Sequence, residues 1–210
     1  MAELILARHG ETVWNVEKIY RGRIDVNLDE VGIKQAELLG KYLSSWKLEA
    51  IYSSPLRRAT DTANIIARYQ KIGVQIAEGL VDFDYGEWQS LPEQEVKKLY
   101  PSLLNEWHNN PHKVRMPGGE SLDDVRRRAI EVINDALSKY VGSVVLVSHR
   151  VVNKVLICSL LGLENSYFWN IKQDVSGITI FHYADARFVL TRYNDTSHLR
   201  ELEKCVLDDF

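Results

Sequence analysis

The chain has 210 residues with a formal net charge of −3, and 45% of its residues are hydrophobic against 26% charged. These proportions are typical of a globular protein with a substantial core, and they exclude a disordered chain, a collagen, a coiled coil and a disulfide-stapled scaffold. The balanced charge also argues against a nucleic acid or a membrane surface as the main partner.

Three further features bear on the compartment. No apolar run approaches the length of about 18 residues that a membrane span needs, and the N-terminal residues lack the build of a signal peptide. The two cysteines, Cys158 and Cys205, are too few for a disulfide framework. Cys158 lies in an apolar run, which predicts a buried, reduced thiol. We therefore expect a cytoplasmic protein.

Short apolar runs alternate with helix-like periodicity along the chain, a pattern typical of an α/β sheet. The expected strands, in chain order, are Leu4–Ala7, Ala50–Tyr52, Val144–Val147, Gly177–Tyr183 and Phe188–Tyr193. A short turn joins the last two, which predicts a C-terminal hairpin. We expect a three-layer α/β/α sandwich with a mainly parallel central sheet.

The helices between these strands have recognisable starts. The expected N-terminal caps, in chain order, are Asp29, Ser54 followed by Pro55, Ser90 with Glu93, and Ser121 with Asp124. A further helix is expected after Val151. The segment from about 90 to 120, with several prolines and irregularly spaced aromatic residues, predicts a helical insertion over one end of the sheet. We expect residues 1–210 to form a single domain.

Three of the expected strands end in polar clusters. These clusters are Arg8-His9 after the first strand, Arg57-Arg58 after the second, and Ser148-His149-Arg150 after the third. Because ligands of open α/β sheets bind at the carboxyl ends of the strands, we expect the clusters to share one crevice. Guanidiniums, imidazoles and hydroxyls together suit a tetrahedral oxyanion such as phosphate. A single histidine at a strand end is more often structural, so the interpretation depends on all three clusters.

The first cluster belongs to a longer motif, Arg8-His9-Gly10-Glu11-Thr12. Other segments follow in order, among them Asp25-x-x-Leu28, Ser53-Ser54-Pro55-Leu56-x-Arg58, Gly118-Gly119-Glu120-Ser121 and Val147-Ser148-His149. In residue types and spacing these segments resemble the histidine phosphatase superfamily, also called phosphoglycerate mutase-like, and its RHGET signature. The resemblance covers nearly the whole chain and implies the phosphoglycerate mutase-like fold.

The resemblance also implies roles for individual residues. His9 would be the nucleophile that forms a phosphohistidine, and for this its imidazole must be neutral. Nearby cations lower the pKa of such a histidine and help to keep it neutral. Arg8, Arg58 and His149 would bind the phosphoryl oxygens, with Asn15 as a further neutral donor.

The family's general acid is a glutamate in a Leu-x-Glu-x-x-x-Gly segment. The matching segment here is Leu80–Gly86, and Asp82 occupies the position of the glutamate. An aspartate is one methylene shorter, so it must lie closer to the leaving oxygen. The alternatives are Asp84, Glu87, Glu11 or a reaction without an acid.

Several other positions bear on the substrate. Arg21 and Arg23 flank Gly22 in a loop that covers the substrate in relatives, where they would either bind a carboxylate or second phosphate or remain solvated. Arg150 stands where relatives often have glycine, and it either meets a substrate anion, narrows the pocket or forms a surface salt bridge. Ser90 also replaces a common glycine of the family.

The resemblance therefore implies a metal-independent phosphomonoesterase that acts on a small phosphorylated metabolite, similar to phosphoserine, phosphoglycerate or α-ribazole phosphate. No cofactor and no metal are expected, and the sequence has no Walker loop and no carboxylate cluster at ligand spacing. One alternative is a cofactor-dependent phosphoglycerate mutase, which resembles longer chains. Another is a catalytically silent binder of a phosphorylated ligand. A monomer or a homodimer is expected.

Overall fold

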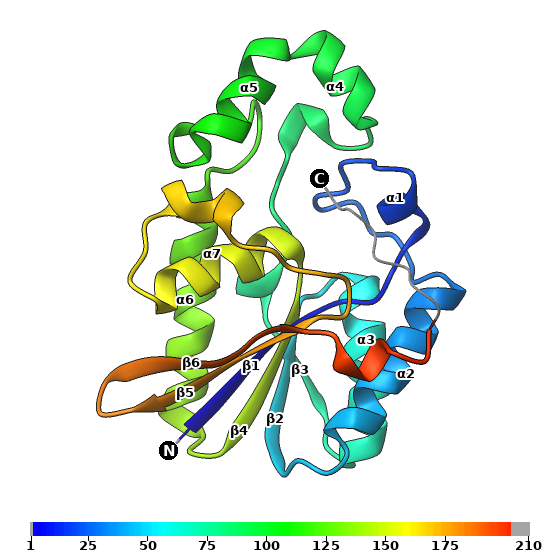
Figure 1. Cartoon of the computed structure of the whole chain (residues 1–210), viewed down its shortest axis with the longest axis vertical. Helices are drawn as coiled ribbons and strands as arrows, with labels where there is room; N and C mark the ends of the chain where they lie inside the picture. The colour runs from blue at the N-terminus through cyan, green and yellow to red at the C-terminus, as the bar shows by residue number, and fades with distance from the viewer. Residues whose placement is uncertain (1, 203–210) are drawn as a thin grey trace.

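A computed structural model describes residues 2–202 and consists of a central sheet covered by helices on both faces (Figure 1). The strands are β1 Ala2–Arg8, β2 Leu48–Ser53, β3 Val74–Ile76, β4 Ser143–Ser148, β5 Ile178–Ala184 and β6 Arg187–Asp195. The α-helices are α1 Val13–Val16, α2 Glu30–Leu43, α3 Arg57–Gln70, α4 Glu93–Leu99, α5 Pro101–Asn109, α6 Leu122–Lys139 and α7 Arg150–Leu160.

The six strands form one sheet in the order β3-β2-β4-β1-β5-β6. β1 pairs in parallel with β4 and antiparallel with β5, while β2 pairs in parallel with both β4 and β3. β5 and β6 form the predicted antiparallel hairpin. The expected α/β fold with a mainly parallel sheet is confirmed. Because β1, β2 and β4 run in the same direction, their carboxyl ends meet at one edge.

The alternation of side chains along β1 explains why both faces of the sheet are covered. Leu4 and Leu6 point to one face and belong to a large apolar cluster with buried residues of α6 and α7. Ile5 and Ala7 point to the other face and pack in a second cluster with buried residues of α2 and α3. A strand buried on both faces is typical of the centre of a parallel sheet.

Two of the predicted helix caps are confirmed and two are wrong. The Gly32 N–H donates to Asp29 Oδ1 at 2.8 Å, and Ser121 and Asp124 form the capping box at the start of α6. Pro55 is not helical, because α3 begins at Arg57 and the Ser54 side chain is directed to a histidine instead. Ser90 has a φ of +69° and lies before α4, whose N-cap is Pro92.

The short strand β3 was not predicted. It has only three residues at the edge of the sheet, and none of them is fully buried, so its apolar pattern is weak. α4 and α5 lie where helices were expected between about 90 and 120, and they extend beyond the carboxyl ends of the strands (Figure 1). Cys158 is buried with a free thiol as predicted, whereas Cys205 lies outside the described residues.

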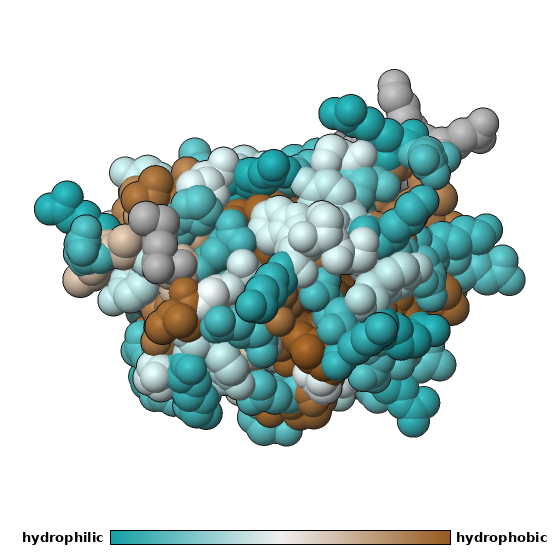
Figure 2. All heavy atoms as spheres, turned by 90° about the horizontal axis from the view of Figure 1, so that it is seen from below, coloured by the Kyte–Doolittle hydropathy of each residue, from teal (hydrophilic) through white to brown (hydrophobic). Residues whose placement is uncertain are grey.

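The opposite end of the molecule, at the amino ends of the parallel strands, has a mainly hydrophilic face with scattered hydrophobic residues (Figure 2). Among residues 2–202, no helix combines the length and apolar character needed to cross a bilayer.

Candidate active site

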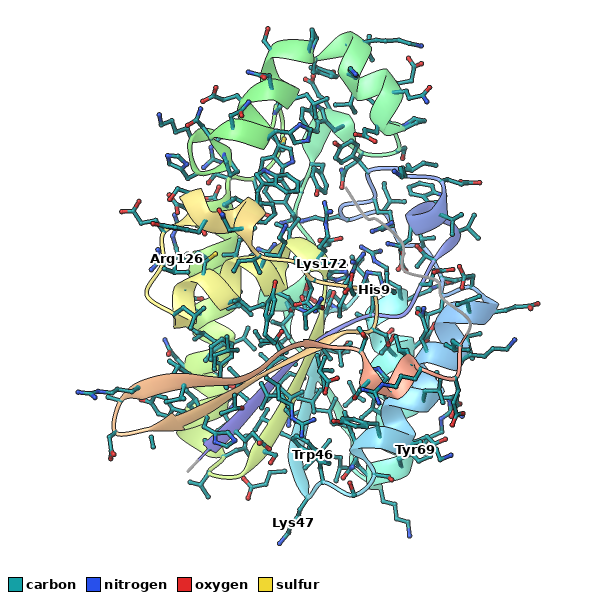
Figure 3. All side chains as sticks on the ribbon, viewed as in Figure 1. His9, Trp46, Lys47, Tyr69, Arg126 and Lys172 are labelled. Atoms are coloured by element: carbon teal, nitrogen blue, oxygen red, sulfur yellow. The ribbon has the colours of Figure 1, made fainter. Side chains whose placement is uncertain are left out.

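Four side chains from the strand ends meet near the centre of the molecule. Arg8 ends β1, His9 follows it, Arg58 lies in the first turn of α3, and His149 caps α7 directly after β4. Each is only 0 or 1% exposed, and His9 lies at the inner end of β1 (Figure 3). We call these four residues the strand-end cluster. The expectation that the polar strand ends share one place is met by this geometry.

The imidazole of His9 is held in one tautomer. Its Nδ1 lies 2.6 Å from the Gly10 carbonyl oxygen, which can only accept, so the proton of the neutral ring is on Nδ1. Nε2 is buried and has no hydrogen-bond partner among residues 2–202. Burial lowers the pKa of His9 well below its ordinary value, and the charges of Arg58 and Arg8 lower it further. His9 is therefore neutral at pH 7, with a lone pair on Nε2.

The loop that carries His9 is fixed by close backbone packing. The Gly10 N–H donates to Thr62 Oγ1 at 3.1 Å, and the Ser176 N–H donates to the His9 carbonyl at 3.2 Å. A Cβ on Gly32 would lie 2.1 Å from the Glu11 carbonyl oxygen, so only glycine permits this approach of α2 to the loop. The position of the imidazole is thus set by the sheet, α2 and α3 together.

The two arginines of the cluster are held by carbonyl oxygens from distant segments. Arg8 donates through Nη1 to the Gln173 carbonyl at 2.7 Å. Arg58 donates to the carbonyls of Gly22 and Ile24, at 2.8 and 2.9 Å. The Nε–H of Arg58 is buried without a hydrogen-bond partner in the described part of the chain. Such a donor is available to an anion that enters the cluster.

His149 is oriented by a serine. Its Nε2 lies 2.7 Å from Ser54 Oγ, and that oxygen also accepts from the Leu56 N–H at 3.3 Å. A hydroxyl can both donate and accept, so this contact orients the imidazole in either tautomer. Burial lowers the pKa of His149 well below its ordinary value, with the Arg58 charge as the next cause. The ring centroid lies 5.1 Å from that of His9.

Asp82 connects the cluster to a neighbouring pocket. Its Oδ2 accepts from Arg58 at 2.9 Å and lies 3.5 Å from His149 Nδ1, and its Oδ1 accepts from the Phe83 N–H at 2.8 Å. The carboxylate is thus adjacent to two members of the strand-end cluster.

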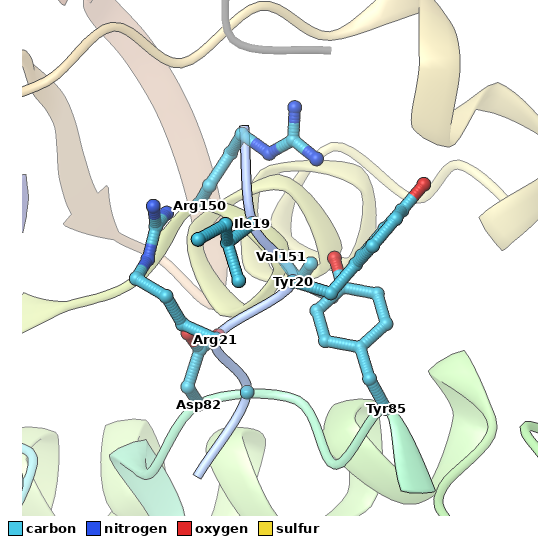
Figure 4. Close-up of a pocket in the computed structure, with 8 residues that line it drawn as sticks. Ile19, Tyr20, Arg21, Asp82, Tyr85, Arg150 and Val151 are labelled. Carbon is cyan, nitrogen blue, oxygen red and sulfur yellow. The ribbon is translucent and has the colours of Figure 1, made fainter. Parts of the chain in front are cut away.

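The same carboxylate lines a small pocket, which we call the side pocket (Figure 4). Its lining residues are Ile19, Tyr20, Arg21, Gly22, Asp82, Tyr85, Arg150 and Val151. In the close-up, Arg21 and Asp82 lie on one side and the rings of Tyr20 and Tyr85 on the other, with Arg150 above them. The structure therefore brings three of the predicted substrate residues, Arg21, Gly22 and Arg150, to one place.

Two predicted binding residues lie elsewhere or make local contacts. Arg23 is 42% exposed and pairs with Glu120 at 2.9 Å and Asp84 at 3.5 Å, outside the side pocket. Asn15 is buried, and its Oδ1 accepts from both the N–H and the hydroxyl of Thr12.

The alternative acids differ from Asp82 in their surroundings. Asp84 accepts from the Gly86 N–H, Glu87 is exposed and accepts from the Tyr100 hydroxyl, and Glu11 is buried in the loop after His9. Of the carboxylates considered as the acid, Asp82 is the one among the lining residues of the side pocket.

Sequence reasoning missed three residues that shape the site. They are Ser54, which orients His149; Gln173, whose carbonyl holds Arg8; and Tyr85, whose ring lines the side pocket. The Ser54 position was visible in the motif, but it was interpreted as a helix cap. Gln173 acts through its backbone, so its side-chain type carries no signal.

Within residues 2–202, no group of three or more His, Cys, Asp and Glu side chains is arranged to hold a metal ion.

Comparison with known proteins adds independent findings. The family model of the histidine phosphatase superfamily (branch 1) matches residues 4–196. Phosphoserine phosphatase 1 of Hydrogenobacter thermophilus is 38% identical over 202 residues, which is 96% of each chain. The structure of Bacillus stearothermophilus YhfR matches with a TM-score of 0.91 and 30% identity, over 95% of this chain and 100% of that one. An Entamoeba histolytica phosphoserine phosphatase mutant in complex with phosphoserine matches with a TM-score of 0.81 and 30% identity, over the same shares.

Proposed function

The chain belongs to branch 1 of the histidine phosphatase superfamily and is a phosphatase, and we propose that it hydrolyses a small phosphorylated metabolite. The reaction proceeds through a phosphohistidine on His9, and phosphoserine is the first candidate substrate. The observation that carries the proposal is the state of His9. A buried, neutral imidazole with its Nε2 unpartnered in the described chain is a nucleophile ready to react.

In the first step, His9 Nε2 attacks phosphorus in line with the ester oxygen. The N–P bond forms as the P–O bond breaks, and negative charge is spread over the three remaining phosphoryl oxygens. Arg8, Arg58 and His149 supply guanidinium and imidazole N–H groups against that charge in a buried, low-dielectric place. Because these groups are already fixed by carbonyls and by Ser54, little reorganisation is needed during the reaction.

In this proposal Asp82 takes up a proton when the substrate binds and gives that proton to the leaving oxygen. The position of Asp82 between Arg58, His149 and the side pocket supports this role, since the alcohol part of the substrate would leave through that pocket. In the second step the same carboxylate accepts a proton from water, which attacks the phosphohistidine. The N–P bond breaks, phosphate leaves, and His9 returns to its neutral form.

Phosphate release in the presence of EDTA tests the proposal. We expect hydrolysis of phosphoserine, 3-phosphoglycerate, α-ribazole phosphate or sugar phosphates without added metal, with one substrate far above the rest in kcat/KM. Acid-labile phosphate should be trapped on the protein and should be absent from His9→Ala.

Two results would contradict the proposal. Interconversion of 3- and 2-phosphoglycerate that is stimulated by 2,3-bisphosphoglycerate would identify a mutase. Binding of the same compounds without any release would identify a silent binder.

A further inference from the structure

We propose that Arg150 binds a carboxylate of the substrate and makes the enzyme selective for phosphomonoesters that carry a carboxylate close to the ester. This inference rests on the proposed function and assigns the part of the substrate that is not phosphate. It concerns a residue that departs from the glycine common in similar sequences.

The first argument is position. Arg150 is the first residue of α7 and directly follows His149, the capping residue that belongs to the strand-end cluster. Its side chain lines the side pocket together with Asp82, whose carboxylate touches Arg58. A group bound by Arg150 would therefore belong to the same small molecule whose phosphate occupies the cluster.

The second argument is that the guanidinium is held in place. It stacks over the ring of Trp169 at 5.7 Å from the ring centroid, and it is close enough to Tyr85 to hydrogen-bond its hydroxyl. Trp169 is itself fixed, because its Nε1–H donates to the Trp107 carbonyl at 2.6 Å. A guanidinium that is already oriented loses less entropy when it binds an anion.

Tyr85, the other side chain that contacts Arg150, is also held rigidly. Tyr85 is 5% exposed, and its ring makes edge contacts with Tyr20 at 5.0 Å and with Phe83 at 4.8 Å between centroids. Both tyrosine rings line the side pocket. The pocket wall is therefore aromatic and stiff, which favours one orientation of a bound substrate.

The third argument is charge. The lining residues include two guanidiniums, of Arg21 and Arg150, and one carboxylate, of Asp82. That carboxylate is already paired with Arg58 at 2.9 Å. The Arg150 guanidinium itself brings a positive charge to the pocket, which favours an anionic group over a neutral polyol. The planar fork of arginine matches the two oxygens of a carboxylate.

Arg23 is a useful contrast with Arg150, because its side chain lies outside the side pocket. It is two residues from Arg21, but its guanidinium is already paired with Glu120 and Asp84 and lies outside the side pocket. Charge on the loop alone does not make a binding site. The assignment to Arg150 rests on the pocket and on its aromatic support.

The test compares substrates that differ only in the carboxylate. 3-Phosphoglycerate has a carboxylate where glycerol 3-phosphate has a hydroxymethyl group, and the rest of the two molecules is the same. Wild-type enzyme should prefer 3-phosphoglycerate in kcat/KM. In Arg150→Met we expect the ratio of the two kcat/KM values to fall by about 10- to 100-fold, the range of one charge-assisted hydrogen-bonded contact. Arg150→Lys, which keeps the charge without the planar fork, should retain part of the preference.

A matched control removes the same charge far from the site. Arg68 lies on α3, is 68% exposed and contacts Glu37 at 3.6 Å. Arg68→Met should leave the ratio at the wild-type value. Circular dichroism and thermal melting verify that each variant is folded.

Several outcomes would overturn the inference. One is an unchanged ratio in folded Arg150→Met. A second needs no variant: wild-type enzyme that hydrolyses both compounds equally well would remove the carboxylate site while leaving the phosphatase function intact. Failure to release phosphate from any compound would overturn the proposed function, and this inference with it.

Discussion

The strand-end cluster and the side pocket adjoin each other, yet they are built in different ways. The cluster is almost fully buried, comes from the ends of β1 and β4 and the start of α3, and is tied by hydrogen bonds to carbonyls far away in the sequence. The side pocket is formed by a loop around Arg21, by the segment around Tyr85 and by the first turn of α7. In the proposed mechanism a rigid sheet edge supports the chemical step, and loops supply the selectivity.

The largest effect is expected in the cluster. His9→Ala should lower kcat by at least ~10³-fold on every substrate, because the variant lacks the Nε2 lone pair that forms the N–P bond in the proposed mechanism. The measurement is phosphate release in EDTA. His182→Ala serves as the control, since that histidine contacts Glu3 near the amino end of β1, away from the strand-end cluster. Activity of more than a few per cent in His9→Ala would refute the mechanism.

Asp82 lies between the two regions, so the loss of activity caused by replacing it should depend on the substrate. We expect Asp82→Asn to slow alkyl phosphates by about 10²- to 10⁴-fold, and p-nitrophenyl phosphate far less, because p-nitrophenolate needs little protonation to leave. Loss of the ion pair with Arg58 affects both substrates alike. The readout is therefore the difference between the losses of activity on the two substrates. Asp84→Asn is the matched control. Equal losses on both substrates would remove Asp82 from the acid role.

A smaller effect within the cluster is expected from Ser54. Ser54→Ala removes the hydroxyl that orients the His149 ring, so kcat/KM should fall by about tenfold, the value of one hydrogen bond. Ser53→Ala is the control, because its hydroxyl donates to the Ser54 carbonyl and not to the histidine. If the two variants are equally active, the orientation of His149 does not depend on Ser54.

The cluster should also make stability depend on pH. Burial lowers the pKa values of His9 and His149 in the folded protein, so below about pH 6.5 the unfolded chain binds protons that the folded chain does not. The free energy of unfolding should therefore fall as the pH drops below about 6.5, by about 1 kcal/mol per pH unit for each histidine. Urea unfolding between pH 7.5 and 5.5 measures this slope. His9→Gln should reduce it by the share of one histidine, and a slope identical to that of the wild type would contradict the assignment.

Much of the fold follows from local sequence features, and the predictions that are wrong have physical causes. The buried runs of β1, β2 and β4 and the caps Asp29 and Ser121 were predicted because each depends on neighbours in the sequence. The starts expected at Ser54 and Ser90 are wrong because tertiary contacts use those residues otherwise. β3 was missed because a three-residue edge strand buries too little to show a pattern.

The site also has one part that the sequence predicts and one part that it does not. The strand-end cluster could be predicted, because the sheet direction alone brings the ends of β1, β2 and β4 together. The composition of the side pocket could not, since it depends on how the loops fold over that edge. Arg21 and Arg23 have equal claims in the sequence, yet Arg21 lines the pocket and Arg23 pairs with Glu120.

The central place of β1 has a consequence for how the chain becomes active during synthesis. β1 is the first strand to be made, but its partner β4 carries Ser143, which contacts Glu3 across 140 positions, and Gln173 contacts Arg8 across 165. At roughly 10 residues per second, His9 waits about 15 s for the segments that bury it. Contacts of such long range also form late in refolding. Enzymatic activity should therefore be a late marker of folding, acquired only when β1 has met β4 and the segment around Gln173.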